Sequence, residues 1–260
     1  MEPATPFIPA AFQSALATRS LGRYLVYREV LLSTMDLAAR EAAEGAPHGT
    51  LVFAEEQTAG RGRRGRSFYS PAGQNLYFTL VLRCHVDVHR RLPLIVPLAV
   101  CTAIQPEAPA ARIKWPNDIW IGDRKVAGML IDAELSPAGA VALPGIGINV
   151  NADPTVVREL RDIATCLARE LGREVNREQL LARVCNALEP LLDADVDDIL
   201  DSYRAQSSTL GRRVIVSPVG GEPFEGEAVA IQDDGSLAVR STSGSIETVN
   251  AADVSVRPLA

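Results

Sequence analysis

The sequence is poor in the residues that build disulfide frameworks and metal sites. Its 260 residues include only four cysteines and three histidines. The cysteines are widely spread, and no two of them form a C-x-x-C pair: Cys84, Cys101, Cys166 and Cys185. Such spacing is typical of reduced, mostly buried thiols in a cytosolic protein, and it predicts no metal site built from protein ligands.

Long hydrophobic runs are also missing. The longest apolar run, LPLIVPLAVCTAI at 92–104, is too short to span a bilayer and contains two prolines. We interpret it as a buried helix. The first residues, MEPATPFIPAAFQSAL, lack the basic segment and the clean apolar core of a signal peptide. We therefore expect a cytoplasmic protein that does not enter a membrane.

Positive charge is in deficit over the whole chain. The sequence has 32 acidic residues against 26 lysines and arginines, which gives a formal net charge of −6. General nucleic-acid binders are usually basic overall, so this balance argues against that class. A local basic segment in such a chain suggests an anion site instead.

One short segment is strongly basic. Within EEQTAGRGRRGRSFYSPAGQNLYF, residues 55–78, arginines and glycines are interleaved: Gly60, Arg61, Gly62, Arg63, Arg64, Gly65 and Arg66. Glycines let the backbone approach an anion, and arginines add charge-assisted bonds to carboxylate or phosphate. The segment therefore suits a phosphoryl or acyl-phosphate group. Composition alone is equally compatible with a mobile basic loop or an RNA-binding arm.

The familiar phosphate-binding sequences do not explain this loop. The chain contains no G-x-x-x-x-G-K-[ST] sequence. Gly60, Gly62 and Gly65 fit G-x-G-x-x-G after a predicted strand, but RSFYSPAGQN cannot be the helix that should follow. Neither a Walker loop nor a dinucleotide-binding turn is predicted.

A second segment, KWPNDIWIGDRKVAGMLID, places charges at strand ends. Lys114 ends a predicted strand, and a Pro-Asn turn precedes Asp118. Lys125 follows on the next strand, before Gly128, which permits a close approach. Two lysines and an aspartate can therefore converge, although a surface hairpin with solvated charges would show the same pattern.

A third segment, GIGINVN, ends a strand of small residues. Asn149 and Asn151 alternate outward from it, which suits contact with a ligand. Asparagines that cap a strand or form a turn would give the same pattern. The sequence leaves both readings open.

Apolar periodicity and turn residues predict an α+β protein with a mixed sheet and two unequal parts. The expected helices cover 33–45, 92–104 and 176–193, and the expected strands cover 50–57, 75–83, 111–118, 125–135 and 140–151. Beyond about Leu210, short strand-like segments predict a small β-barrel. We expect a loosely ordered arm at 1–20, a large domain at 21–207 and a small domain at 208–260.

The quoted segments, together with SPAGQNLYFTLVLR, strongly resemble biotin protein ligases in order and spacing over roughly residues 20–257. The resemblance implies a catalytic domain like that of class II aminoacyl-tRNA synthetases, followed by an SH3-like C-terminal domain. It implies that biotin and Mg-ATP give biotinoyl-5′-AMP, and that the biotinoyl group passes to a lysine of a biotin carboxyl carrier protein or domain. ATP and Mg²⁺ are then the expected cofactors.

The length of the chain bears on the type of ligase that this resemblance implies. Only about thirty residues precede Ser33, too few for the winged helix-turn-helix and linker of many bacterial members. We expect the monofunctional type, without specific DNA binding. The oligomeric state stays open between monomer and homodimer.

The resemblance also implies the roles of individual residues. The expected biotin contacts are Ser33, Thr34, Gln57, Gly60, Arg61, Gly62, Arg63, Lys114 and Gly128. The expected catalytic residues are Arg63, Lys114, Asp118 and Lys125. The expected nucleotide contacts are Arg61, Arg63, Arg66, Asn149 and Asn151. Met35 departs from the family pattern, because asparagine is frequent after the Ser-Thr pair.

Physical chemistry supports these roles, and alternatives remain. Biotin's carboxylate and the α-phosphate are both anions, so cations must bring them together. Lys114 is expected to hold the carboxylate and then the phosphate. Asp118 would orient and deprotonate the acceptor lysine, or merely shape its turn.

A lipoate or octanoate ligase is the alternative enzyme, but Gln57 and the Ser33–Thr34 turn favour a ureido ring. An RNA-binding module is the alternative outside enzymes.

Overall fold

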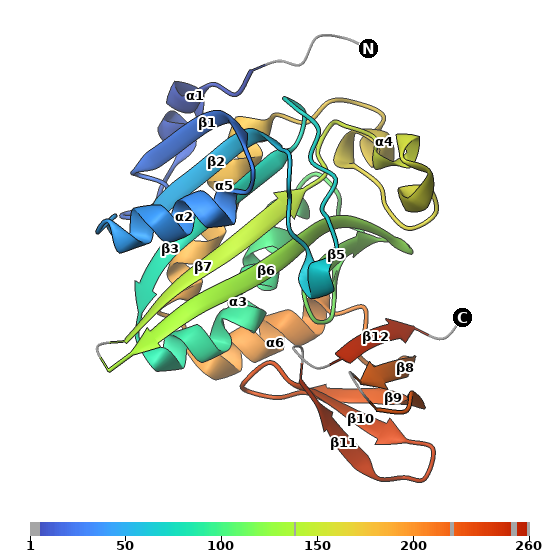
Figure 1. Cartoon of the computed structure of the whole chain (residues 1–260). Coiled ribbons are helices and arrows are strands. Elements are labelled where there is room, and N and C mark those ends of the chain that lie inside the picture. The colour runs from blue at the N-terminus through green and yellow to red at the C-terminus, as the bar shows by residue number, and fades with distance from the viewer. Residues whose placement is uncertain (1–5, 138, 219–220, 251–253, 259–260) are drawn as a thin grey trace.

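A seven-stranded mixed sheet forms the centre of the larger part of the chain (Figure 1). The computed structural model describes residues 6–137, 139–218, 221–250 and 254–258. The strands of this sheet are β1 (Leu25–Leu31), β2 (Thr50–Gln57), β3 (Leu76–Cys84), β4 (Ala111–Lys114), β5 (Asp118–Ile121), β6 (Arg124–Ser136) and β7 (Gly139–Ile148). Their order is β1-β2-β3-β7-β6-β5-β4. Only β1 and β2 pair in parallel; the other neighbours are antiparallel.

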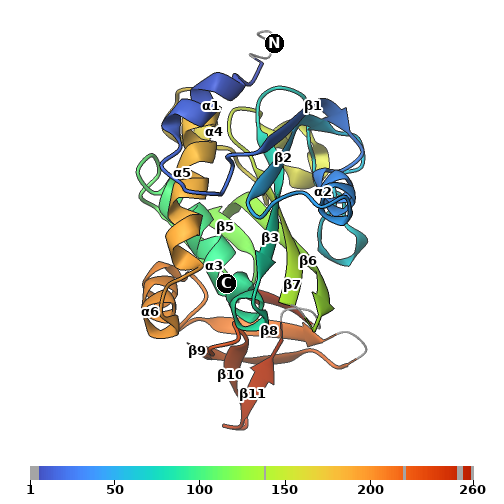
Figure 2. The same ribbon diagram turned by 90° about the vertical axis from the view of Figure 1, so that its left-hand side faces the viewer.

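Helices cover the two faces of this sheet unequally. On one side lie α1 (Pro9–Ala15), α3 (Val86–Ile104), α5 (Arg177–Leu191) and α6 (Val196–Gln206), whereas α2 (Thr34–Ala43) lies on the other (Figure 2). A short helix, α4 (Leu167–Leu171), follows β7, and three-residue 3₁₀ turns cover 63–65, 154–156 and 158–160. In the described residues, no helix is long and apolar enough to cross a membrane.

Strand alternation divides the apolar residues between two cores. In β2, Leu51 and Phe53 belong to the larger core, and Val52 belongs to the smaller core with Leu37 of α2. Successive side chains of a strand point to opposite faces, so one strand supplies both cores. The face that carries α2 is only partly covered, which leaves room for a site beside that helix.

The C-terminal part is a five-stranded antiparallel sheet in the order β11-β10-β9-β8-β12. Its strands are β8 (Arg213–Pro218), β9 (Phe224–Ile231), β10 (Leu237–Ser241), β11 (Ile246–Val249) and β12 (Val254–Pro258). Its β9–β10 turn meets the larger part, because the indole nitrogen of Trp115 donates to the Gly235 carbonyl oxygen over 2.8 Å. The α+β class and the separate small β domain are confirmed.

Several expected elements differ in detail. Residues 111–135 form three strands rather than two, because the chain reverses at Trp115–Asn117 before Asp118 starts β5. The buried helix begins at Val86, earlier than the apolar run itself. Strand β7 ends at Ile148, so Asn149 and Asn151 lie beyond it, and Asn149 is buried rather than turned outward.

The expectation of a loosely ordered arm at 1–20 is wrong for residues 6–20; residues 1–5 lie outside the described residues. Phe7 is 3% exposed and Phe12 is fully buried. The Phe7 amide donates to Glu55 Oε1 over 2.6 Å, and Glu189 accepts from the Arg19 and Ser20 amides. Apolar burial and backbone hydrogen bonds therefore fix this segment against β2 and α5.

Candidate active site

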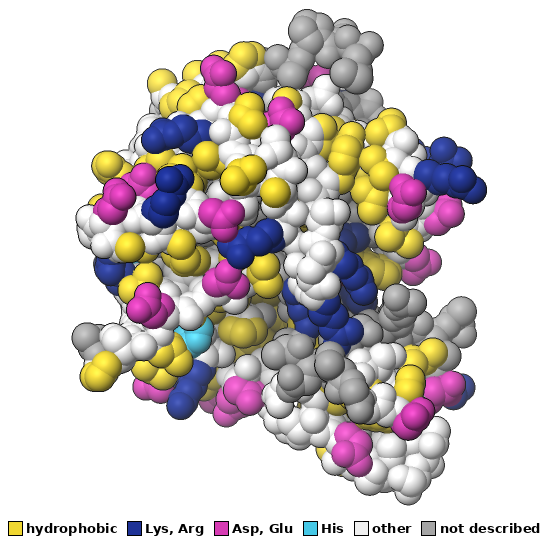
Figure 3. All heavy atoms as spheres, viewed as in Figure 1, with side chains coloured by type: hydrophobic (Ala, Val, Ile, Leu, Met, Phe, Trp, Pro, Cys, Tyr) yellow, Lys and Arg dark blue, Asp and Glu magenta, His cyan; other side chains and the backbone are white. Residues whose placement is uncertain are grey.

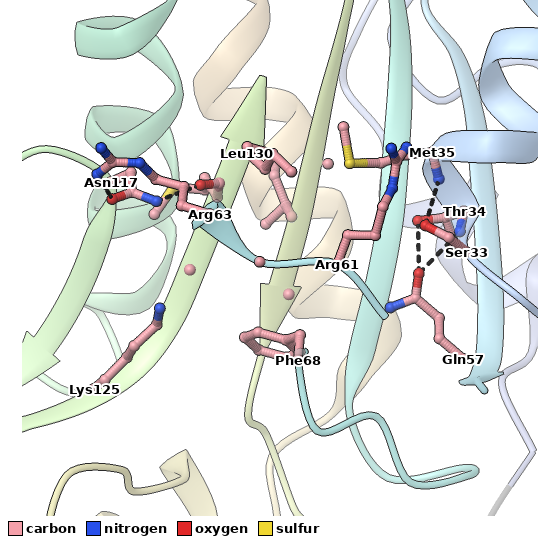
Figure 4. Close-up of a pocket in the computed structure, with 16 residues that line it drawn as sticks. Ser33, Thr34, Met35, Gln57, Arg61, Arg63, Phe68, Asn117, Lys125 and Leu130 are labelled. Carbon is pink, nitrogen blue, oxygen red and sulfur yellow. Dashed lines mark hydrogen bonds between the residues drawn. The ribbon is translucent and has the colours of Figure 1, made fainter. Parts of the chain in front are cut away.

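A pocket opens on the face of the sheet that carries α2 (Figure 4). It is bounded by the start of α2, the arginine-rich segment at residues 60–68, which we call the basic loop, the Trp115–Asn117 turn, and the glycine-rich parts of β6 and β7. Its lining residues are Ser33, Thr34, Met35, Gln57, Arg61, Gly62, Arg63, Phe68, Asn117, Lys125, Gly128, Met129, Leu130, Gly145, Ile146 and Gly147.

One end of the pocket is formed by neutral hydrogen-bonding groups, and the Arg61 side chain lies beside them (Figure 4). The Thr34 amide and hydroxyl both donate to Gln57 Oε1, over 2.9 and 3.1 Å, and the buried Thr79 hydroxyl donates to Thr34 Oγ1 over 2.9 Å. Gln57 Nε2 donates to Ser70 Oγ over 3.2 Å. Ser33 is the N-cap of α2, and its side chain accepts from the Met35 amide. Ser33 therefore caps α2 and lines the pocket at the same time.

Glycines give the pocket its depth. The strand register places Gly147 opposite Gly128 and Gly145 opposite Leu130, so these four residues share one face of the sheet. A Cβ atom on Gly147 would lie 2.6 Å from the Phe68 ring, and one on Gly145 would lie 2.7 Å from the Met35 side chain. Larger residues there would push Phe68 or Met35 aside.

The basic loop crosses the pocket. The Gly62 amide donates to the Arg66 carbonyl oxygen over 2.7 Å, and a 3₁₀ turn at Arg63–Gly65 closes the loop. Arg63 Nη1 donates to Asn117 Oδ1 over 3.0 Å. Burial lowers the pKa of the Arg63 guanidinium below its usual value, and the Asp118 carboxylate opposes that shift. Arg63 is thus a partly buried cation beside an anion in the pocket wall.

Lys125 is a third cation of the pocket lining, beside Arg61 and Arg63. Its Nζ lies 2.7 Å from Asp118 Oδ1 and 6.0 Å from the centre of the Phe68 ring. Cross-strand pairing of Asp118 with Gly128 holds the carboxylate next to the lysine. The predicted convergence of Asp118 and Lys125 is therefore observed. Figure 3 shows basic side chains gathered in a hollow near the middle of one face.

The structure does not bring Lys114 into the pocket lining. Its Nζ stands 5.0 Å from the centre of the Trp120 ring. Lys114 ends β4 on the same face as Asp118, its cross-strand partner, but it lies on the outermost strand of the sheet. Lys125, two strands further in, does line the pocket.

Five other expected site residues lie outside the lining: Gly60, Arg66, Asp118, Asn149 and Asn151. Asp118 is connected to the pocket through its ion pair with Lys125. Gly60 packs under Phe68, and the Arg66 side chain is exposed. Asn149 Nδ2 donates to the Thr165 carbonyl oxygen over 3.0 Å, and Asn151 exchanges two hydrogen bonds with Val175. The side chains of these asparagines hold the loops after β7 in place. This position agrees with the alternative in which they cap the strand or form a turn.

Some lining residues were not identified from the sequence. They are Phe68, Asn117, Met129, Leu130, Gly145, Ile146 and Gly147. Asn117 lies inside the quoted KWPND segment, and the period of two in GIG could have indicated a glycine wall. Among the described residues, no group of three or more His, Cys, Asp or Glu side chains could hold a metal ion.

Two family models match this chain. Residues 27–151 match the biotin/lipoate A/B protein ligase family, and residues 209–257 match the biotin protein ligase C-terminal domain. These two ranges correspond to the larger sheet with its pocket and to the small β domain.

Named relatives and solved structures agree with these two family models. The chain is 33% identical over 249 residues to the bifunctional ligase/repressor BirA of Bacillus subtilis, covering 92% of this chain and 76% of that protein. It is 34% identical over 238 residues to the biotin–[acetyl-CoA-carboxylase] ligase of Mycobacterium tuberculosis, covering 84% and 83%. The biotin protein ligase from Aquifex aeolicus in complex with biotin and ATP superposes with a TM-score of 0.76 at 27% identity, covering 91% and 100%. The chain therefore belongs to the biotin protein ligase family.

Proposed function

We propose that this protein activates biotin with ATP and transfers it to a lysine of a biotin carboxyl carrier protein or domain. One observation carries the proposal: a single pocket joins an end with neutral hydrogen-bonding groups, at Thr34 and Gln57, to a cationic end, at Arg63 and Lys125. A ureido ring offers neutral hydrogen-bonding groups for the first end. A carboxylate and a phosphate offer anions for the second.

In the first step, a biotin carboxylate oxygen attacks the α-phosphorus of ATP, and pyrophosphate leaves with the electrons of the broken bond. Arg63 and Lys125 reduce the repulsion between the two anions and stabilise the charge that grows on the phosphoryl oxygens. Mg²⁺ would enter with ATP and neutralise phosphate charge. Its binding needs few protein ligands, because Mg²⁺ in such sites is held mainly by phosphates and water.

In the second step, the neutral amine of the carrier lysine attacks the biotinoyl carbonyl carbon and AMP leaves. The amine loses a proton as the amide forms, so a base must lie near the reacting carbon. Asp118 is our candidate for that base. In the resting site its carboxylate also holds the Lys125 ammonium, so a single aspartate serves both half-reactions.

The basic loop would shield the intermediate. A mixed anhydride is hydrolysed when water reaches it, and closing a site over a reactive intermediate prevents this side reaction. Gly62 and Arg63 already line the pocket. The loop therefore lies where it can cover the reacting groups.

The choice of acid tests this proposal against a lipoate- or octanoate-transferring ligase. Thr34 and Gln57 offer hydrogen bonds that a plain acyl chain cannot use, so biotin is the expected substrate. ATP-dependent pyrophosphate release should be measured with biotin, lipoate and octanoate in turn. Release with biotin, and little with the other two, is expected. Faster pyrophosphate release with octanoate or lipoate than with biotin would contradict biotin as the substrate.

A further inference from the structure

Two arginines hold the basic loop on opposite sides of the pocket (Figure 4). Arg63 reaches Asn117 on one side. On the other side, Arg61 Nη2 lies 3.1 Å from Asp36 Oδ1 and 3.6 Å from Asp132 Oδ2. One guanidinium nitrogen thus meets two carboxylates, which we call the acidic pair.

The acidic pair belongs to the two walls of the pocket. Asp36 lies in the first turn of α2, which begins beside Ser33. Asp132 lies on β6, where side chains alternate, so it shares a face with the lining residues Gly128 and Leu130. Arg61 therefore connects the loop to both walls at the rim of the pocket.

Backbone hydrogen bonds attach only the residues just before the loop, where the Thr58 and Ala59 amides donate to the Leu31 and Leu32 carbonyl oxygens, both over 2.9 Å. The Arg61–Ser67 bridge, the Gly62-to-Arg66 hydrogen bond and the Phe68-to-Gly60 hydrogen bond all join one part of the loop to another. They give the loop its shape without joining it to the rim. Its position over the pocket must then depend on side chains such as Arg61.

Exposure makes this attachment reversible. The side chains of Arg61, Asp36 and Asp132 are 41%, 54% and 47% exposed. Exposed ion pairs are individually weak and are screened by salt. Without Arg61, the two carboxylates would face each other at the rim and repel, so closing the loop also relieves that repulsion.

We propose that Asp36 and Asp132 are positioning residues that hold the basic loop closed through Arg61. They set the fraction of molecules in which the loop covers the pocket. On the proposed function, they also slow the escape of biotinoyl-5′-AMP before transfer. Neither carboxylate is required to touch the substrate.

Limited trypsin digestion of the ligand-free protein tests the attachment without depending on activity. The double variant Asp36→Asn/Asp132→Asn keeps every loop arginine as a cleavage site. Two exposed pairs of ordinary strength predict cleavage about twofold to thirtyfold faster after loop arginines. Asp36→Glu/Asp132→Glu should restore slow cleavage, because it keeps both charges. Glu225→Gln, which removes an exposed ion pair to Arg213, is the matched control and should cleave like the parent.

Two further measurements complete the test: the salt dependence of loop cleavage and the rate at which biotinoyl-5′-AMP is released. Added salt should speed loop cleavage in the parent more than in the double Asn variant, since the variant has no pair left to screen. The double Asn variant should also release pre-formed biotinoyl-5′-AMP faster than the parent, by a similar factor. Equal loop cleavage in parent and double Asn variant, with unchanged thermal melting, would overturn the proposal. If no adenylate forms at all, the proposed function fails, and the trypsin result still decides on the acidic pair.

Discussion

The Lys125 ammonium, which belongs to β6, lies 2.7 Å from the Asp118 carboxylate at the start of the neighbouring strand β5. The lysine is 32% exposed and the aspartate 17%, so the pair lies in the pocket wall and is still open to a ligand. When an anionic substrate arrives, Lys125 can turn to it while Asp118 stays beside the reacting groups. On the proposed function, the pair would link charge neutralisation in the first step to proton removal in the second.

Replacing Lys125 with alanine should slow the first step. The change removes a cation from the place where the carboxylate and α-phosphate meet, and such contacts are worth about a hundredfold to a thousandfold in rate. Biotin-dependent pyrophosphate release measures the effect. Lys114→Ala is the matched control, since Lys114 rests against Trp120 outside the pocket lining, and it should retain most of the rate. A larger loss in Lys114→Ala than in Lys125→Ala would return the role to Lys114.

Asp118→Asn should separate the two half-reactions. Asparagine keeps the shape of the side chain but loses its charge and basicity, so transfer to the carrier lysine should slow more than adenylation. Higher pH should restore part of the transfer rate, because the acceptor lysine then loses its proton unaided. Single-turnover transfer from pre-formed biotinoyl-5′-AMP measures this. Transfer at the parent rate near neutral pH would reduce Asp118 to a residue that shapes the turn.

Gly147→Ala should weaken biotin binding. The added Cβ would lie 2.6 Å from the Phe68 ring, so the ring must move into the pocket or away from the loop. The KM for biotin should rise about tenfold, in line with overpacking costs of roughly 1–3 kcal/mol, while the KM for ATP changes less. Gly122→Ala is the matched control: its φ of +59° makes alanine strained there, but nothing lies within 4 Å of the added Cβ atom, so stability should fall while the KM for biotin stays at the parent value. Equal KM values for biotin in parent and Gly147→Ala would show that Phe68 does not limit the pocket.

Acid should weaken the attachment of the N-terminal segment. Burial alone would raise the pKa of Glu189, but hydrogen bonds from the Arg19, Leu21 and Ser20 amides outweigh it and lower the pKa to about 2. A carboxylate with a depressed folded-state pKa stabilises the fold fully above its ordinary value, and this stabilisation is lost as pH falls toward the folded value. Glu189 thus stabilises the fold at neutral pH and ceases to do so between about pH 4.5 and about pH 2.

Urea unfolding of Glu189→Gln tests this dependence. The variant should be less stable than the parent at neutral pH. The difference between their unfolding midpoints should shrink as pH falls from about 4.5 toward about 2, because the parent carboxylate is then protonated as well. A difference that stays constant over this range would mean that the Glu189 charge does not stabilise the fold.

Local sequence signals identified much of the fold. The strand at 50–57 and the starts of the helices expected at 33–45 and 176–193 agree with the structure, because apolar runs and capping residues such as Ser33 and Asn176 act within a few positions. Short-range signals failed at 111–135, where the reversal before Asp118 adds a strand. They also failed for residues 6–20, because the burial of Phe12 depends on α5, which comes much later in the chain.

The candidate site was likewise only partly predictable from the sequence. The family resemblance identified Gln57, Arg63 and Lys125 as site residues, but local sequence could not decide which lysine lines the pocket. That choice depends on the order of strands across the sheet, with β4 at its edge. The contact of Phe68 with Gly147 likewise depends on how the loop folds back over β7. Neither fact is encoded in neighbouring residues.

Intact mass spectrometry of an acceptor gives the most direct test of the proposed activity. A biotin carboxyl carrier domain should be incubated with the protein, biotin and Mg-ATP, beside a carrier whose acceptor lysine is replaced by arginine. We predict that the parent carrier gains the mass of one biotinoyl group, only when both biotin and ATP are present, and that the arginine carrier gains none. An unchanged parent carrier, in a reaction where a known biotin ligase modifies it fully, would contradict the proposed activity.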